Sequence, residues 1–81
     1  MHSPTLDLRG LKCPLPALLA RRALTRVAAG TALEVLADDP LAALDVPHMC
    51  HQEGYDVLDV EAHSAHTRFV LRRPLPESHA R

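Results

Sequence analysis

The sequence is poor in aromatic residues, because Tyr55 and Phe69 are the only ones among 81 residues. Proteins that bind single-stranded nucleic acid by base stacking need several exposed rings, so this composition argues against that class. The formal net charge is -1, which removes the attraction that a basic surface has for nucleic acid. We therefore expect no direct nucleic-acid partner.

Long hydrophobic runs are also missing. No apolar stretch approaches the roughly 20 residues needed to span a membrane, and His2, Asp7 and Arg9 interrupt any early run of the kind a signal peptide has. The two cysteines, Cys13 and Cys50, are too few for a disulfide framework and do not form a C-x-x-C pair. These absences predict a cytoplasmic protein with reduced thiols and no membrane partner.

Hydrophobic periodicity predicts four strands and two helices in one domain. The expected strands cover 6–9, 32–37, 55–62 and 67–72, and the expected helices cover 14–28 and 41–53. The single domain spans 6–72, between a flexible N-terminus at 1–5 and a flexible C-terminal tail at 73–81. Pro47 falls inside the second helical segment, where a proline costs about 3 kcal/mol. We therefore expect a short turn over 41–44 and a restart with Asp45 as the cap.

The order of these elements predicts an α+β fold, a two-layer α/β sandwich with the order β-α-β-α-β-β. The four-stranded mixed sheet carries both helices on one face. Charged residues on alternate strand positions predict a solvent-exposed, charge-paired opposite face. They are Asp7, Arg9, Glu34, Asp59, Glu61, Arg68 and Arg72.

Cys13 is the principal candidate for chemistry. It directly precedes Pro14, with Pro16 two residues later and Gly10 ending the first strand. Prolines suit the first turn of a helix, so Cys13 is expected at a helix N-terminus. The helix dipole there, with support from Arg9 and Lys12, predicts a lowered thiol pKa and an available thiolate. The alternative is a small buried cysteine without chemistry.

The first helix also predicts a surface for protein partners. A helical projection places Pro16, Ala20, Ala23, Leu24 and Val27 on one apolar face. Leu15 and Leu18 fall instead on the polar side, beside Arg22. Exposed leucines next to the thiol suit partner docking, although scattered surface leucines are also common.

The stretch 6–16, with its Cys-Pro-x-Pro element at Cys13, resembles the signature of the TusA (SirA-like) family of sulfur-carrier proteins. The resemblance continues through 37–40 and 45–47 to Cys50, and it covers the chain from Leu6 to Arg72. It implies the same fold as the residue pattern, with Cys13 accepting sulfane sulfur as a persulfide and no cofactor.

The resemblance also implies two protein partners. These are a sulfur donor, such as a cysteine desulfurase or rhodanese, and a sulfur acceptor. Family pathways include tRNA thiolation, molybdenum-cofactor maturation and sulfur oxidation, and the pathway served by this chain stays open. Leu15 stands where a tRNA-thiolation member has an acidic residue, which weakens that assignment. Whether such a carrier counts as an enzyme is a matter of definition.

Two other functions are weighed against the carrier. One is a non-catalytic regulatory or RNA-binding module of the same fold, in which Cys13 is structural. The other is a thiol redox protein that cycles Cys13 against Cys50, although Cys50 is expected to be buried beside Val46 and Met49. Four histidines, His48, His51, His63 and His66, lack the spacing of a complete zinc site, so no metal is expected. Asp38 and Asp39 are interpreted as a turn and helix cap, with an acidic proton-transfer pair as the alternative.

Overall fold

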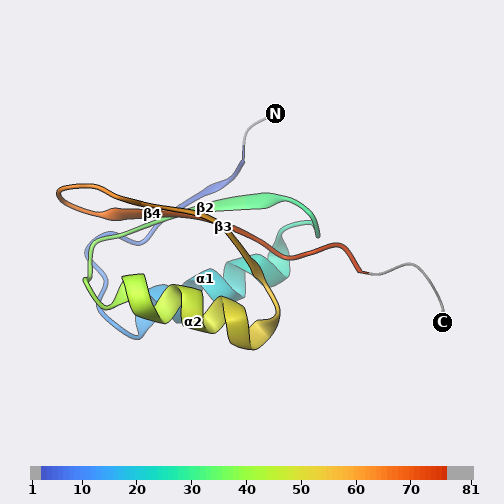
Figure 1. Cartoon of the computed structure of the whole chain (residues 1–81), viewed down its shortest axis with the longest axis horizontal. Coiled ribbons are helices and arrows are strands. Elements are labelled where there is room, and N and C mark those ends of the chain that lie inside the picture. Colours follow the sequence, from blue (N-terminus) through green and yellow to red (C-terminus); the bar gives the residue numbers. More distant parts are fainter. Residues whose placement is uncertain (1–2, 77–81) are drawn as a thin grey trace.

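The computed structural model describes residues 3–76 and confirms the expected order of elements (Figure 1). Both helices lie side by side on one face of the sheet, which makes the two-layer α+β sandwich. The outer parts of the expected flexible ends, 1–2 and 77–81, lie outside the described residues. The elements are β1 (Thr5–Asp7), α1 (Leu15–Arg26), β2 (Ala32–Ala37), α2 (Ala42–Glu53), β3 (Asp56–Ala62) and β4 (Thr67–Arg72).

The sheet is mixed, as expected, with the strand order β1-β2-β4-β3. β1 and β2 run parallel because α1 carries the chain back between them, while β4 pairs antiparallel with both β2 and β3. The β3–β4 pairing shifts register between Val57 and Asp59. Because β1 and β2 are parallel neighbours, the segments that follow them start at the same edge of the sheet, and these segments form the site described below.

The core lies between the sheet and the helices. Alternate residues of β2 and β4 point inward, including Leu33, Val35, Phe69 and Leu71, while α2 contributes Val46. Burial of each large side chain contributes about 1.5–3 kcal/mol. The predicted inner face of α1 is confirmed for Pro16, Ala20 and Leu24, which are buried, and for Ala23 and Val27, which are half-buried.

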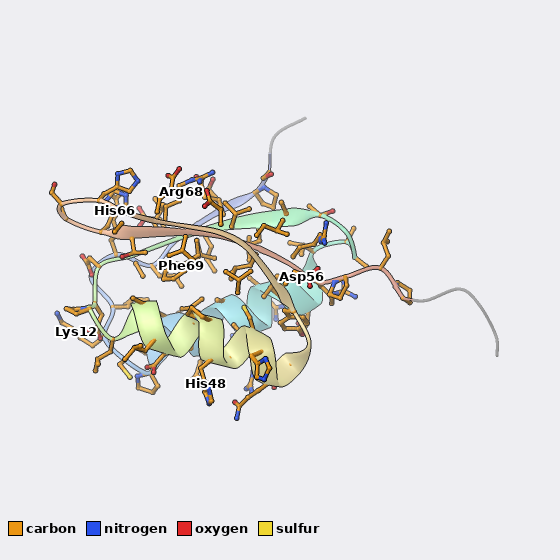
Figure 2. The ribbon with its side chains drawn as sticks, viewed as in Figure 1. Lys12, His48, Asp56, His66, Arg68 and Phe69 are labelled. Atoms are coloured by element: carbon orange, nitrogen blue, oxygen red, sulfur yellow. The ribbon has the colours of Figure 1, made fainter. Side chains whose placement is uncertain are left out.

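The other face of the sheet is charge-paired, as predicted. Arg68 forms ion pairs with Glu34, Asp59 and Glu61, and Arg72 pairs with Asp56 at 2.8 Å. Figure 2 shows Arg68 on the side of the sheet away from the helices and Phe69 on the side that faces them. The core side of β2 and β4 therefore faces the helices, whereas Val57 and Val60 of the edge strand β3 stay partly exposed to solvent.

The predicted break in the second helix is wrong. α2 runs without interruption from Ala42 to Glu53, with Pro47 inside it, and Asp45 lies in its first turn rather than at its cap. The proline removes only one N–H donor, the one that would pair with the carbonyl of Ala43. Burial of Val46 and Met49 on either side of Pro47 offsets that loss, because both pack into the core.

The first helix ends at Arg26, earlier than the expected residue 28, and Val27 already has an extended backbone. The guanidinium of Arg73 donates hydrogen bonds to the carbonyls of Leu24 (2.8 Å) and Val27, which would otherwise lack partners at the helix end. The Arg73 carbonyl accepts the N–H of Gly30 at 2.7 Å. Arg73, the first residue of the expected tail, is therefore held against α1.

Candidate functional site

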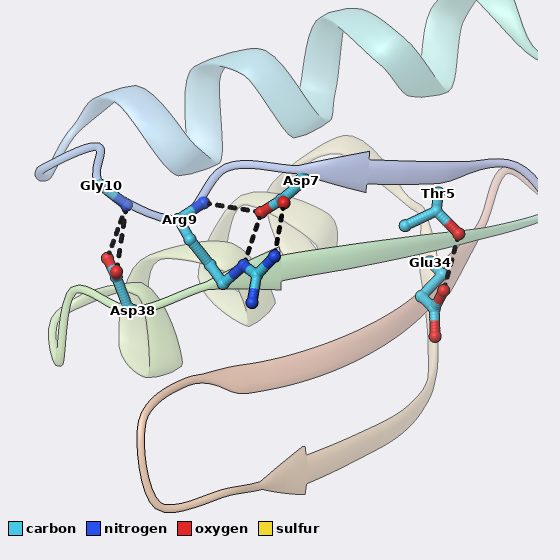
Figure 3. A network of polar contacts seen from close by, with 6 residues as sticks. All are labelled: Thr5, Asp7, Arg9, Gly10, Glu34 and Asp38. Atoms are coloured by element: carbon cyan, nitrogen blue, oxygen red, sulfur yellow. Dashed lines mark hydrogen bonds and ion pairs between the residues drawn. The ribbon is translucent and has the colours of Figure 1, made fainter.

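The segment between β1 and α1 carries Cys13. Polar contacts hold this segment at two places that precede Cys13 in the chain (Figure 3). Asp7 accepts hydrogen bonds from the backbone and the guanidinium of Arg9. The chain then turns at Gly10, whose φ of 91° favours glycine. The Gly10 N–H donates to both carboxylate oxygens of Asp38, at 2.9 and 3.0 Å. Asp38 thus joins this segment to the end of β2.

Asp39 fixes the backbone of Cys13 itself. Its Oδ2 accepts the Cys13 N–H at 2.5 Å, and its Oδ1 accepts the Leu41 N–H at 3.1 Å. These two backbone hydrogen bonds hold the pKa of Asp39 below its usual value, with a smaller contribution from the charge of Lys12. Asp39 accepts the Leu41 N–H in a turn ahead of α2, as expected, but its expected role as helix cap is wrong, because the cap residue is Leu41 and it has no side-chain hydrogen bond. Asp38 and Asp39 also anchor the segment that carries Cys13.

The thiol of Cys13 is exposed and donates a hydrogen bond to a carboxylate. Cys13 Sγ lies 2.6 Å from Oδ2 of Asp45, in the first turn of α2. This hydrogen bond raises the pKa of Cys13, and partial desolvation and the negative charges of Asp45 and Asp39 raise it further. The resting site therefore favours the protonated thiol.

The expected lowering of the Cys13 pKa is wrong. Pro14 and Pro16 carry no N–H, and the N–H of Leu15 donates to the Lys12 carbonyl at 2.8 Å. The N-terminus of α1 therefore offers few donors to a thiolate, while two carboxylates lie close to the sulfur. Arg9, expected to support the thiolate, is paired with Asp7 instead.

The other motif residues occupy the places that the sequence predicted. Pro14 is the cap residue of α1, and Pro16 is buried in its first turn. The peptide bond between Cys13 and Pro14 is cis. Proline at these positions favours the start of the helix at this point in the chain. The position of the exposed Cys13, directly before the helix, is thereby set as well.

The predicted docking residues lie together on the outer side of α1. Leu15 and Leu18 are each 44% exposed, and with Arg22 they line one groove, which Glu53 and Tyr55 close from the other side. A second groove of about 280 Å³ runs between α1 and α2, with Pro14 and Asp45 at the end nearest Cys13. Leu18 lines both grooves, so the two grooves adjoin each other along α1.

Cys50 is a buried structural thiol, as expected. It is fully inaccessible in the core beside Val46, and burial, with a smaller effect of Asp56, raises its pKa to about 11. Cys13 and Cys50 do not form a disulfide. Solvent therefore reaches the thiol of Cys13 in the folded protein and does not reach that of Cys50.

The histidines are distributed over two regions. His63 and His66 stack at the β3–β4 turn with ring centroids 4.7 Å apart, and His63 Nε2 lies 3.3 Å from Glu61. His48 and His51 are exposed on α2. Among residues 3–76, no three His, Cys, Asp or Glu side chains are grouped in a way that could hold a metal ion. Over the same residues, no helix is long and apolar enough to cross a membrane.

The sequence did not predict that two residues of this site, Asp39 and Asp45, contact Cys13. The signal that could have placed them is the parallel pairing of β1 and β2, which brings the segments after both strands to one sheet edge. Their separations from Cys13, 26 and 32 residues, hide this proximity from any local motif.

Fold and site together define a small two-layer α+β protein that presents one cysteine ahead of a helix. A family described as sulfurtransferase TusA matches residues 4–73. Two proteins of Neisseria meningitidis, from serogroups A and B and named as candidate sulfur carrier proteins, are 49% identical over 59 residues. These alignments cover 73% of this chain and 80% of each relative.

A solved structure supports the same assignment. The crystal structure of a SirA-like protein from Desulfitobacterium hafniense superposes with a TM-score of 0.74 at 25% identity. The match covers 88% of this chain and 97% of the other. The chain therefore belongs to the TusA sulfurtransferase family, as the Cys-Pro-x-Pro resemblance predicted.

Proposed function

We propose that this protein is a sulfur carrier that accepts sulfane sulfur as a persulfide on Cys13 and relays it to an acceptor protein. The observation that carries the proposal is the contrast between its two thiols. Cys13 is exposed on an anchored segment, and Cys50 is sealed in the core. The names of the Neisseria relatives favour the same role.

The chemistry needs no external oxidant or reductant. Sγ of Cys13 attacks the outer sulfur of a donor persulfide, the donor's S–S bond breaks, and a new S–S bond forms on Cys13. The proton that leaves Cys13 balances the one taken up by the donor thiolate. In the second step an acceptor thiolate attacks the outer sulfur, and Cys13 returns as a thiol. These steps use thiols and persulfides alone, so the proposal includes no cofactor.

The partners of the proposed cycle are two proteins, a donor such as a cysteine desulfurase or rhodanese and an acceptor. Leu15, Leu18 and Arg22 would offer them a docking surface, because all three line one groove on α1, the helix that follows Cys13. Docking there would also place the donor's outer sulfur close to Cys13. The cytoplasm, where thiols stay reduced, suits such a carrier.

The redox alternative is less compatible with the structure. A disulfide between Cys13 and Cys50 would require Cys50 to leave the core, where it is fully buried. The alternative of a non-catalytic regulatory or RNA-binding module leaves the exposed thiol without a role. Neither alternative is favoured by a specific contact among the described residues.

A relay assay tests the proposal. Isotopically labelled sulfur is supplied as cysteine to a cysteine desulfurase, in the presence of the wild-type protein or its Cys13→Ser or Cys50→Ser variant. We expect reductant-labile label on the wild-type protein and the Cys50→Ser variant, followed by its transfer to a thiol acceptor. The same assay with a loaded rhodanese covers the second donor class. Label that depends on Cys50, or no label from either donor, would contradict the carrier.

A further inference from the structure

The carboxylate that faces the sulfur has a consequence for how firmly Cys13 would hold its cargo. In the empty protein the Cys13 Sγ–H donates to Asp45 Oδ2 at 2.6 Å. Once Sγ carries a second sulfur it has no hydrogen, so this hydrogen bond cannot exist in the loaded protein. The interaction therefore stabilises the empty state alone.

The loaded state also acquires a repulsion. The outer sulfur lies about 2 Å from Sγ, which keeps it within about 5 Å of Asp45 Oδ2 if Sγ stays in place. A persulfide is an anion near neutral pH, and like charges at this distance repel each other. Asp39, held at the backbone of Cys13, adds a second negative charge on the same side.

Few cationic groups lie near the sulfur among residues 3–76. Lys12 acts on Asp39, Arg9 is paired with Asp7, and His48 of α2 lines the groove that also contains Asp45. The charges that raise the pKa of Cys13 are those of Asp45 and Asp39, both negative. The surroundings of the thiol therefore disfavour an added anion.

From this geometry we infer that Asp45, whose carboxylate contacts Sγ, weakens the retention of sulfur on Cys13, so that the loaded protein discharges readily. The inference rests on the proposed function and adds a direction to it: this site releases sulfur rather than storing it. The exchange is R–S–SH plus Cys13–SH giving R–SH plus Cys13–S–SH. One S–S bond breaks, one forms, and one proton moves from Sγ to the donor sulfur.

The test measures the equilibrium constant of that exchange with glutathione persulfide and glutathione as the probe, read by intact mass. Asp45→Asn removes the charge with little change of shape. We expect it to raise the equilibrium constant for loading about threefold to fivefold at neutral pH, the range of an exposed charge interaction. Asp59→Asn makes the same charge change on the open face of the sheet and is expected to leave the constant unchanged.

The pH dependence separates an electrostatic role from a structural one. At acidic pH the persulfide is protonated, and its S–H can donate to Asp45. The difference between the wild-type protein and Asp45→Asn should therefore shrink as pH falls through the pKa of the persulfide. Asp45→Glu, which keeps the charge, should restore much of the wild-type behaviour at neutral pH.

Each outcome bears on a different claim. Loading of the wild-type protein with an equal or lower constant for Asp45→Asn would overturn the inference and leave the carrier intact. A pH-independent difference would assign Asp45 a structural role and would also overturn the inference. Failure of the wild-type protein to load would overturn both claims. If Asp45→Asn does not fold, Asp45→Gln removes the charge with a residue that favours a helix.

Discussion

Asp39 connects the backbone of Cys13 to the start of α2. Its two carboxylate oxygens accept the N–H groups of Cys13 and Leu41, at 2.5 and 3.1 Å, although these residues are far apart in the chain. The position of the thiol relative to Asp45 depends on this connection, because Asp45 lies in the first turn of α2 that follows Leu41.

Removal of this carboxylate by Asp39→Ala is expected to destabilise the protein at neutral pH. Because folding lowers the Asp39 pKa, its contribution is fully present above the unfolded-state pKa of about 3.9 and is lost as pH falls through the folded-state value. Urea midpoints should therefore differ at neutral pH and converge on acidification below about 4. A difference that is constant across this range would contradict the ionic role of Asp39.

The resting thiol of Cys13 is expected to react slowly with small alkylating reagents. Because Asp45 raises the Cys13 pKa, the thiolate fraction at neutral pH lies below that of an ordinary cysteine. Alkylation of the Cys50→Ser protein should therefore show an inflection at higher pH when folded than when unfolded in urea. The Asp45→Asn change in this background should move the folded inflection to lower pH. A folded inflection below the unfolded one would contradict the geometry of the site.

Arg73 is expected to contribute to stability although it follows the last strand. Arg73→Ala removes two charge-assisted hydrogen bonds to the end of α1, so the free energy of unfolding should fall by about 1–3 kcal/mol. Arg22→Ala is the control on the same helix, because Arg22 is exposed and its replacement should change stability by about 0.5 kcal/mol or less. Chemical denaturation measures the free energy of unfolding of both variants. Equal losses of stability in Arg73→Ala and Arg22→Ala would contradict the capping role of Arg73.

Pro47 is expected to be replaceable with a gain in stability. Pro47→Ala restores the N–H that can pair with the Ala43 carbonyl inside α2. The gain is partly offset by the greater freedom of the unfolded chain, about 0.4–1 kcal/mol, which leaves about 2 kcal/mol. Thermal unfolding measures this change. A loss of stability would mean that the proline ring is needed where it packs, beside the buried Val46.

The docking surface is expected to affect transfer from proteins and not from small molecules. Leu18→Asp should slow sulfur transfer from a protein donor by about tenfold, the effect of losing one buried apolar contact at an interface. Loading by glutathione persulfide should be unchanged. Leu58→Asp is the matched control, since Leu58 on β3 is 45% exposed and Leu18 is 44% exposed. Equal slowing by both variants would argue against docking at α1.

Much of the fold could be predicted because the informative patterns are local. Alternation in β2 and β4 predicted their outward charged residues, Glu34, Arg68 and Arg72, and the helical period predicted the buried face of α1 and its exposed Leu15 and Leu18. The burial of Cys50 followed from its neighbours in the same way. In each case nearby residues in the sequence carry the signal.

The electrostatics of the site could not be predicted, since they depend on contacts between distant segments. Dipole reasoning gave Cys13 a lowered pKa, whereas Asp45, 32 residues away, raises it. The helix cap supplied by Arg73 is likewise non-local, 49 residues from Leu24. α2 remains continuous through Pro47 because tertiary packing outweighs one missing hydrogen bond.

The most direct test of the carrier is the intact mass of fully reduced protein after brief incubation with a sulfane-sulfur donor. The account predicts a gain of about 32 Da, one sulfur atom, in the wild-type and Cys50→Ser proteins. The gain should be reversed by reductant and absent in Cys13→Ser. No gain with any donor, or a gain that persists in Cys13→Ser, would contradict a persulfide on Cys13.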